Sequence, residues 1–295
     1  MKLDEFTRWV RERQQDVESA LERWVPADAP AGIGEVMRYA VLDGGKRLRP
    51  LLVMAAAEAV AGDAGSALRA AVAVELIHAY SLVHDDMPCM DNDVLRRGKP
   101  TVHVKYGEAQ AMLAGDAMQA LAFEVLTPDE GMPPALMARL ARLLARAAGH
   151  AGMAGGQAID LASVGIRLDE TALRDMHRRK TGVLLQASVL MGAACGSASP
   201  GAAEALSEYG AAVGLAFQVV DDVLDVTQAS EVLGKTAGKD VDQNKPTYVS
   251  LLGLAEAQRY AGALRDQAHA ALARSGLGQA AYLACLADRI VERDN

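Results

Sequence analysis

Apolar residues recur at intervals of three to four residues along most of the chain, which is the spacing of one face of an α-helix. In the first segment this spacing is followed by Leu3, Phe6, Val10, Val17, Leu21 and Trp24. Pro26 and Pro30 come next, and because proline disrupts a helix interior, we expect the first helix to end before them. The stretches 51–60 and 66–87 are apolar at almost every position, which predicts helices that are buried on most sides.

The same spacing predicts helices over most of the remaining chain. They are expected at 34–42, 107–126, 134–148, 150–163, 170–178, 180–195, 201–227, 246–253, 255–274 and 278–292. Polar segments at 91–101 and 227–246 predict loops, and the second is long enough to suggest a functional role. The sequence has no long strand-like alternation, no internal repeat and no interdomain linker. We therefore expect a single all-α domain, a helical bundle that covers residues 1–295.

Composition supports this fold and argues against one class of partner. Hydrophobic residues make up 51% of the 295 residues, enough for a large core. Aromatic residues, which favour strands, make up only 4%. The chain carries 30 Lys and Arg against 38 Asp and Glu, a net charge of −8, so we expect no general nucleic-acid binding.

The cysteines and the apolar stretches bear on the cellular environment. Cys89, Cys195 and Cys285 lie far apart and form no Cys-x-x-Cys pair, which argues against a disulfide framework and favours a reducing, cytoplasmic environment. The first residues alternate charged and apolar positions, so we expect no signal peptide. No stretch reaches about 18 uncharged apolar residues, so we expect no membrane span.

Two acidic clusters lie in the most apolar parts of the sequence. The first, HDDMPCMDND, follows the helix predicted over 66–87, and its aspartates are Asp85, Asp86, Asp91 and Asp93. The second, FQVVDDVLD, lies within the helix predicted over 201–227, and its aspartates are Asp221, Asp222 and Asp225. Asp221 and Asp225 are about one turn apart, so we expect them to share a helix face.

Pro88 removes a geometric difficulty in the first cluster. In a straight helix Asp85 and Asp91 would lie roughly 120° apart and could not converge on one ligand. Pro88 disfavours helical geometry at Met87, which predicts a kink that folds Asp91 back toward Asp85. Crowded carboxylates repel one another unless cations bridge them, and oxygen ligands select hard ions such as Mg²⁺. One such cluster alone could be a solvated helix end, but two within apolar helices favour a metal-dependent site.

Basic residues accompany both acidic clusters. They are Lys46, Arg47 and Arg49 in GGKRLRP, Arg96 and Arg97 after the first cluster, and Lys180, Lys235, Lys239 and Lys245 around the second. In an acidic protein this interleaving suggests a substrate with several phosphate oxygens, held partly through metal ions and partly by Lys and Arg directly. Each basic residue taken alone could instead serve surface solubility.

Seven motifs in sequence order resemble those of the trans-isoprenyl diphosphate synthases, the polyprenyl synthetase family, and most closely its bacterial-type farnesyl diphosphate synthases. They are GGKRLRP at 44–50, ELIHAYSLVHDDMPCMDND at 75–93, LRRGKPTVH at 95–103, GGQAIDL at 155–161, KTG at 180–182, FQVVDDVLD at 217–225 and GKTAGKDVDQNKPTY at 234–248. The resemblance implies an all-α bundle around a deep central cavity, the isoprenoid synthase fold, in a homodimer. It also implies head-to-tail transfer of a prenyl group from an allylic diphosphate to isopentenyl diphosphate.

The resemblance implies roles for individual residues as well. Binding of about three Mg²⁺ ions is implied for Asp85, Asp86, Asp91, Asp221, Asp222 and Asp225. Contact with the allylic diphosphate or with the path of its cation is implied for Arg96, Lys180, Lys235, Lys245, Thr181 and Gln218. Contact with isopentenyl diphosphate is implied for Lys46, Arg49, His78 and Arg97. The implied catalytic set is Asp85, Asp86, Asp91, Lys180, Thr181, Gln218 and Asp221.

Product length is expected to depend on residues below the first acidic cluster. Tyr80 lies five residues before Asp85, about 7.5 Å down the helix axis, and Ser81 is adjacent. In the resembling family an aromatic residue there, with the inserted pair in DDxxxxD, goes with a fifteen-carbon product. We therefore expect (2E,6E)-farnesyl diphosphate, made from dimethylallyl and geranyl diphosphates. Geranylgeranyl or geranyl diphosphate is the alternative, and Tyr80 could also be an ordinary core residue.

Two other functions fit parts of the sequence. Glu75 and His78 form a Glu-x-x-His pair, the ligand spacing of di-iron bundles, but such sites need two copies and the sequence holds one. A non-catalytic partner subunit would be expected to lack some aspartates, and none is missing. No side chain stands out as a general base, so the departing diphosphate is the expected acceptor of the final proton.

Overall fold

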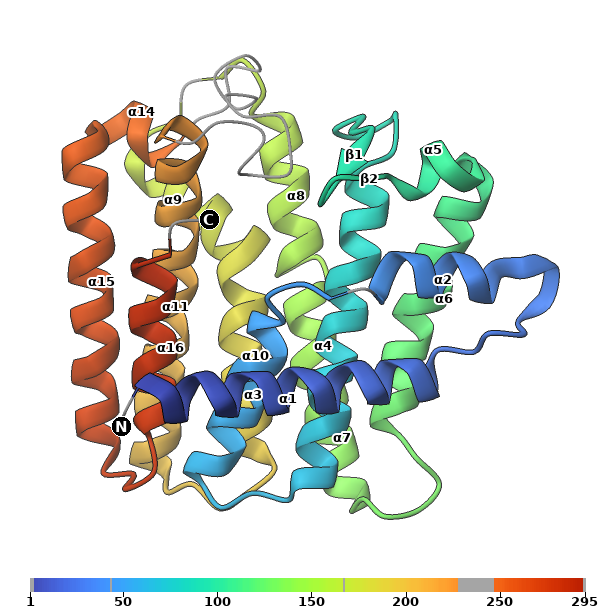
Figure 1. Ribbon diagram of the computed structural model, residues 1–295. Helices are drawn as coiled ribbons and strands as arrows, with labels where there is room; N and C mark the ends of the chain where they lie inside the picture. Colours follow the sequence, from blue (N-terminus) through green and yellow to red (C-terminus); the bar gives the residue numbers. More distant parts are fainter. Residues whose placement is uncertain (1–2, 43, 167, 228–246, 294–295) are drawn as a thin grey trace.

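A computed structural model describes residues 3–42, 44–166, 168–227 and 247–293 of the chain (Figure 1). Its helices are α1 (Leu3–Trp24), α2 (Ile33–Val41), α3 (Leu48–Ala59), α4 (Ala64–Asp85), α5 (Val102–Tyr106), α6 (Glu108–Leu126), α7 (Pro134–Ala148), α8 (Met153–Ala162), α9 (Glu170–His177), α10 (Val183–Ala194), α11 (Pro200–Thr227), α14 (Tyr248–Leu252), α15 (Leu254–Ser275) and α16 (Ala281–Val291). A 3-10 turn at Pro30–Gly32 precedes α2, and a π-helical turn at Arg178–Gly182 joins α9 to α10. The predicted all-α fold class is confirmed.

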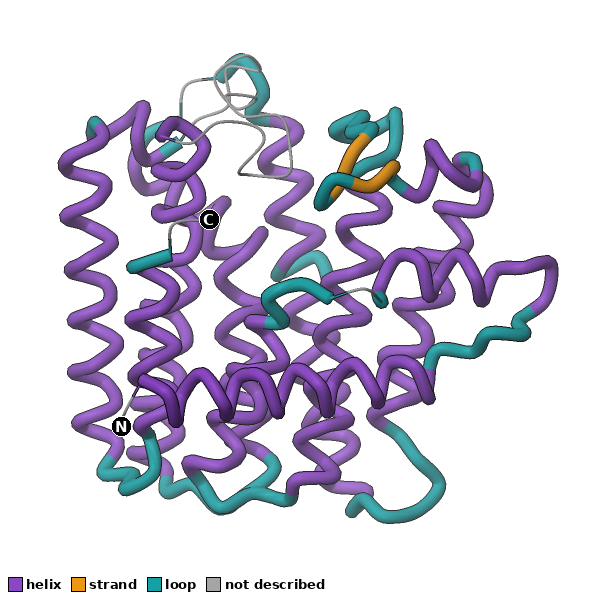
Figure 2. Tube along the Cα trace, in the orientation of Figure 1, coloured by secondary structure: helices purple, strands orange, loops and turns teal. Residues whose placement is uncertain are grey.

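The strands within the described part of the chain form one short hairpin, shown in orange in Figure 2. Strands β1 (Leu95–Arg96) and β2 (Lys99–Pro100) pair antiparallel. Arg97 (φ 53°) and Gly98 (φ 74°) form the two-residue turn between them, and both have the positive φ that such tight hairpin turns require. The expected loop over 91–101 therefore contains a hairpin, which the helical pattern around it did not reveal.

Helix α4 forms the centre of the core. It packs against α3, α6 and α10, and residues 70–77 are buried, as expected for a segment that is apolar at every position except Glu75. By length and composition α4 could cross a membrane, but 67% of its apolar window is buried inside the protein, as in the central helix of a folded core. Figure 1 shows α1 crossing the upright helices of the bundle.

Helix α3 begins three residues earlier than expected. The structure starts it at Leu48, with Arg47 at φ 48° as the residue before it, rather than at the predicted residue 51. Pro50 is thus the third residue of the helix. The first four N–H groups of a helix have no partner within it, so a proline is tolerated there.

The helices predicted over 170–178 and 180–195 form one continuous path. The π-helical turn replaces the predicted break and widens the helix by an inserted residue. The turn lies against two glycines. A Cβ atom on Gly156 would lie 2.2 Å from the Lys180 backbone nitrogen, and one on Gly214 would lie 2.8 Å from Gly182. Close packing against α8 and α11 therefore fixes the shape of this turn.

Candidate active site

The first aspartate motif lies where α4 ends, at the upper end of the bundle in Figure 1. The helix stops at Asp85, two residues before the predicted end, and the chain turns back at once. The Asp91 backbone N–H donates to the Asp85 carbonyl at 2.9 Å, and that of Asp93 donates to the Asp86 carbonyl at 3.1 Å. The kink predicted from Pro88 is confirmed, and it returns Asp91 to the neighbourhood of Asp85.

Asp85 lines a cavity of about 370 Å³ together with Arg49, His78 and Lys180. The pKa of Asp85 is raised to about 6, mainly by burial; the charge of Lys180 lowers it, and the Asp91 and Asp86 carboxylates raise it. The positive charge around this carboxylate is thus too small to offset its burial. A cation bound here would lower the pKa again.

Asp86 and Arg96 are paired with each other. The Arg96 guanidinium donates to Asp86 from Nε at 2.9 and 3.0 Å and from Nη2 at 2.6 Å. Asp86 is only 2% exposed, and burial raises its pKa although Arg96 opposes this. The contacts of Asp86 with metal and of Arg96 with diphosphate stay predictions, and both groups already have a strong partner in this structure.

The second aspartate motif lies near the end of α11, at the same end of the bundle as the first motif (Figure 1). Asp221 is partly exposed, and Arg293 Nη2 donates to it at 3.3 Å. Asp222 is buried and accepts hydrogen bonds from Gln218 Nε2 at 2.9 Å and from the Tyr248 backbone N–H at 2.8 Å. Asp225 is buried too, and its Oδ2 atom has no hydrogen-bond partner among the described residues.

The π-helical turn connects the surroundings of the two motifs. Lys180 Nζ lies 2.5 Å from Asp160 Oδ2, and Lys180 also interacts electrostatically with Asp85 and Asp91. The next residue, Thr181, donates from Oγ1 to Gln218 Oε1 at 3.0 Å, and Gln218 continues the chain of hydrogen bonds to Asp222. The predicted residues Lys180, Thr181 and Gln218 are therefore brought together.

Arg49 and His78 are the two members of the predicted isopentenyl diphosphate set that reach this cavity. Burial lowers the pKa of Arg49 to about 10, so its guanidinium keeps its charge at neutral pH. Burial, followed by the charges of Arg49 and Arg97, lowers the pKa of His78 well below its usual value, so its ring is neutral. A fixed cation next to a neutral imidazole suits a diphosphate that is bound without metal.

The other two members of that set lie elsewhere. Lys46 lines a neighbouring hollow of about 720 Å³ with Phe217 and Arg293. Arg97 donates from Nη1 to the Gly44 carbonyl at 2.9 Å and lies against Gly45, so the hairpin is docked on the GGKRLRP segment. Lys235, Lys239 and Lys245 lie outside the described residues.

Two residues of the cavity region had no predicted role although their motif, GGQAIDL, was noted. Asp160 is buried and forms the ion pair with Lys180. Gln157 lines the cavity, is 9% exposed, and neither polar atom of its amide has a hydrogen-bond partner among the described residues. A buried amide without a partner is costly, so it points to a ligand or water in the cavity. The sequence did contain a pattern that could have indicated these two residues: Gln157 and Asp160 lie three residues apart in an apolar helix, directly after a glycine pair.

Glu75 has a structural role that argues against the di-iron alternative. Its carboxylate accepts from Arg47 Nη1 at 2.6 Å, and both side chains are buried. No three His, Cys, Asp or Glu side chains among the described residues converge closely enough to hold a metal ion unaided. Mg²⁺ normally binds one or two carboxylates and takes its other ligands from substrate phosphates and water. The oxygen donors at the cavity mouth therefore fit a Mg²⁺–diphosphate complex, not an all-protein metal cage.

Tyr80 is a cavity residue, as expected. It lines the same cavity as Asp85, is 8% exposed, and meets the His84 ring edge-on with centroids 5.7 Å apart. Ser81 also lines the cavity, and its hydroxyl donates to the His78 carbonyl at 2.8 Å. The aromatic ring therefore lines the cavity five residues below Asp85.

Replacing Gly156 by alanine is expected to damage the site through the π-helical turn. The new methyl group would meet the Lys180 backbone at 2.2 Å, so the turn must shift and Lys180 must move. We expect a loss of about 1–3 kcal/mol in the free energy of unfolding, as for other overpacked sites, and at least about tenfold lower activity. Thermal unfolding and turnover would measure both effects.

Gly262→Ala on α15, where a Cβ meets nothing within 4 Å, is the matched control and should stabilise the protein slightly. Equal behaviour of the two variants would contradict the close packing at Gly156.

Comparison with known proteins identifies what the chain is similar to. It matches the family model described as polyprenyl synthetase over residues 30–275. Geranylgeranyl pyrophosphate synthase 9 of Arabidopsis thaliana is 46% identical over 99% of this chain and 82% of that protein. An FPP/GFPP synthase from Zymomonas mobilis, solved without ligand, is 41% identical with a TM-score of 0.87, and the match covers 97% of this chain and 99% of that one. A geranyltransferase from Helicobacter pylori, solved with magnesium and isoprenyl diphosphate, is 32% identical with a TM-score of 0.86 over 97% of both chains.

Proposed function

The chain belongs to the polyprenyl synthetase family, and from this premise we propose that it joins an allylic diphosphate to isopentenyl diphosphate, head to tail. The observation that carries the proposal is the cavity in which Asp85, Arg49, His78 and Lys180 meet. The carboxylate of Asp85 and the cations of Arg49 and Lys180 suit two diphosphates of which one is held through metal. The apolar residues of the same cavity suit a prenyl chain.

Departure of the allylic diphosphate needs stabilisation of the charge that develops on it. Bound Mg²⁺ supplies most of that stabilisation, and we propose about three ions, held by the aspartates of both motifs. Lys180 adds a fixed positive charge, and Asp160 keeps its ammonium group in position. Thr181 and Gln218 present a hydrogen-bonded hydroxyl and amide to the path of the allylic cation.

The allylic cation must meet the second substrate before it meets water. Met90, Met153 and Leu161 line the cavity with apolar side chains, which do not compete as nucleophiles for the cation. Arg49 and His78 would hold the diphosphate of isopentenyl diphosphate, so that its double bond attacks the cation. The departed diphosphate then accepts the proton that is lost, and we assign no side chain as a general base.

The direct test is turnover with labelled isopentenyl diphosphate and either dimethylallyl or geranyl diphosphate. We expect chain elongation that needs Mg²⁺ and that stops when EDTA removes the metal, because the leaving group then loses its main stabilisation. Adding excess Mg²⁺ should restore the rate. Elongation that continues in EDTA would contradict the metal-assisted mechanism.

Two product lengths have separate support. The relatives that are named geranylgeranyl pyrophosphate synthases favour a twenty-carbon product, which is our first candidate. The fifteen-carbon product expected from the sequence is the second, and the specific observation in its favour is the aromatic ring of Tyr80 in the cavity.

Tyr80→Ala separates the two candidates. If the ring limits a fifteen-carbon product, its removal should extend the main product by at least one isoprene unit, because the space that the ring occupies in the cavity is then open to the growing chain. Chromatography of the dephosphorylated products would measure this. Tyr80→Phe keeps the ring and is the matched control, so its products should equal those of the original enzyme. An unchanged distribution in Tyr80→Ala would contradict a limiting role for Tyr80.

We further propose that the protein is a homodimer that works in the cytoplasm. Large apolar side chains remain exposed on one helix and its neighbour, at Met112 and Leu113 of α6 and Val104 of α5. Burying such side chains is a usual driving force for association. The three free cysteines suit a reducing compartment. Sedimentation equilibrium tests the dimer, and charged substitutions at Leu113 and Val104 should then yield monomers.

A further inference from the structure

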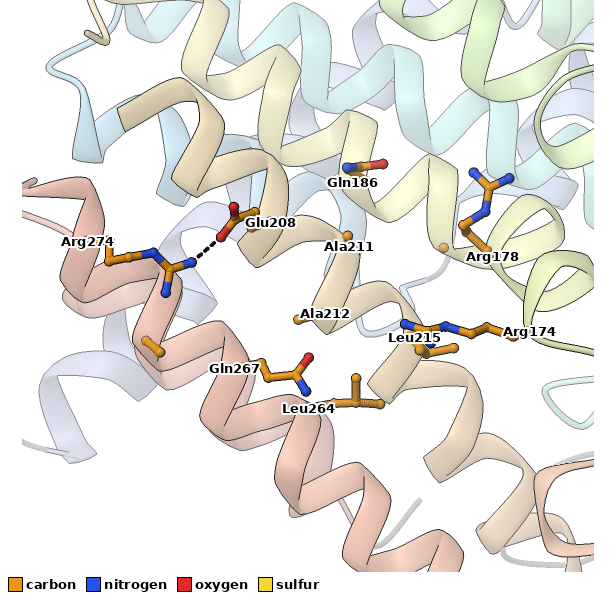
Figure 3. Close-up of a pocket in the computed structure, with 12 residues that line it drawn as sticks. Arg174, Arg178, Gln186, Glu208, Ala211, Ala212, Leu215, Leu264, Gln267 and Arg274 are labelled. Atoms are coloured by element: carbon orange, nitrogen blue, oxygen red, sulfur yellow. Dashed lines mark hydrogen bonds and ion pairs between the residues drawn. The ribbon is translucent and has the colours of Figure 1, made fainter. Parts of the chain in front are cut away.

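A second cavity lies on the outer side of α11. It has a volume of about 560 Å³ and runs between α10 on one side and α15 on the other (Figure 3). We call it the α11 groove. Its floor is Ala211, Ala212 and Leu215 of α11, and Leu264 of α15 lines its side. The floor is apolar, and the small side chain of Ala211 leaves the space above the helix open.

Three arginines surround this apolar floor. Arg174 and Arg178 lie together at one end of the groove and Arg274 lies at the other (Figure 3). Arg274 is paired with Glu208, and Arg178 with Asp175. No ion pair joins Arg174 to any residue in the described part of the chain. Its guanidinium is therefore the charge in this groove that is left for a ligand.

Arg174 and Arg178 place two positive charges four residues apart, Arg174 in α9 and Arg178 at the start of the π-helical turn. Asp175 pairs with Arg178, so an anion at this end of the groove would be held mainly by Arg174, with Arg178 beside it. The chain as a whole carries a net charge of −8, so composition does not account for a basic cluster at this place. Guanidinium groups bind phosphate and carboxylate oxygens through paired hydrogen bonds, and two of them at one end of a groove suit such a head group.

The groove is separate from the reaction cavity. Arg178 and Gly182 of the π-helical turn line the groove, whereas Lys180 and Thr181 of the same turn line the cavity that holds Asp85. The two share no lining residue. One turn of helix thus forms part of the wall of each.

We propose that the α11 groove binds an amphipathic anion, a molecule with a phosphate or carboxylate head and a short hydrocarbon tail. The head lies between Arg174 and Arg178, and the tail lies along Ala211, Leu215 and Leu264. This assignment rests on the shape and charge of the groove and does not depend on prenyl transfer.

The test is calorimetric titration of the full chain with octyl phosphate in EDTA, which weakens any metal-dependent binding in the reaction cavity. We expect saturable binding of one molecule per chain, and at least tenfold weaker binding of inorganic phosphate or octanol, which lack the tail or the charge. Octanoate tests which head group the site prefers. If octanoate binds as tightly as octyl phosphate, the site accepts carboxylates; if octanoate binds more weakly, the site prefers phosphate. Either result supports the proposal.

Variants locate the bound molecule. Arg174→Ala should weaken binding of octyl phosphate at least about tenfold, since a charge-assisted hydrogen bond is lost, and Ala211→Trp should block it by filling the floor. Arg259→Ala, which breaks an exposed ion pair with Glu256 elsewhere on α15, is the matched control and should bind like the original protein. Circular dichroism checks that each variant folds. Prenyl transfer by Arg174→Ala should be as fast as that by the original protein. If neither the original protein nor the variants turned over, the proposed function would be overturned, but the result of the titration would still stand. The groove assignment would be overturned if the original protein did not bind octyl phosphate. It would also be overturned if Arg174→Ala and Ala211→Trp both bound octyl phosphate as tightly as the original protein does.

Discussion

Asp85→Asn is expected to lower turnover by at least about 10³-fold while leaving the helical fold intact. Asn keeps the shape of the side chain but cannot supply the negative charge that a Mg²⁺–diphosphate complex needs. Among the residues that the structure describes, Asp85 is the one acidic side chain that lines the cavity with Lys180. Steady-state rates with saturating Mg²⁺ would measure the loss, and far-ultraviolet circular dichroism would check the fold. Asp129→Asn, in the exposed loop after α6, is the control and should turn over normally.

The same substitution should stabilise the metal-free protein at neutral pH. The folded-state pKa of Asp85, about 6, lies above the usual aspartate value of 3.8, so the folded state favours the protonated carboxyl. Ionisation therefore costs stability as pH rises from about 4 to 6, and the cost is complete above that window. Asn behaves like the protonated form. Asp85→Asn should thus unfold at a higher temperature than the original protein at pH 7, and the difference should shrink as pH falls below 6. Near-normal turnover, or no stability gain at pH 7, would contradict these roles of Asp85.

Glu75→Ala is expected to cost about 3–5 kcal/mol in the free energy of unfolding. Arg47 is 3% exposed and donates to Glu75 at 2.6 Å, to Glu18 at 2.7 Å and to the Val41 carbonyl at 2.6 Å. Removing Glu75 leaves a buried guanidinium without its buried counter-charge, and this pair also joins the start of α3 to α4. Denaturant unfolding would measure the loss.

Two further variants sharpen this test. Glu256→Ala, which removes an exposed ion pair with Arg259, should change stability by less than about 1 kcal/mol. The double variant Arg47→Met with Glu75→Leu should recover much of the loss, because an apolar pair needs no counter-charge. A loss in Glu75→Ala as small as that in Glu256→Ala would show that water reaches Arg47.

The long helices and the kink at Pro88 could be predicted because each depends on residues close together in sequence. Apolar residues at almost every position predict that α4 is buried on most sides, and proline restricts the residue before it wherever it occurs. The presence of both aspartate motifs at one end of the bundle was implied by family resemblance, and the structure places them there.

The partners of the charged residues could not be predicted in the same way. Arg96 was expected to hold diphosphate and pairs with Asp86, and Lys180 pairs with Asp160, which lies twenty residues earlier. Such pairings depend on how elements pack, and sequence spacing carries no information on that. The π-helical turn could not be predicted for the same reason. Its shape depends on close packing against Gly156 and Gly214, which lie in other helices.

The β1–β2 hairpin delivers two neighbouring arginines to different places. Arg96 reaches Asp86 at the end of α4, whereas Arg97 reaches Gly44 in the GGKRLRP segment. Arg96 ends strand β1 and Arg97 lies in the tight turn, so inserting one residue here would change the directions in which both side chains project. The hairpin is therefore a poor place for peptide insertions or grafted epitopes, although it lies at the surface where such changes are usually accepted. The loop between α6 and α7 is the better choice for protein engineering.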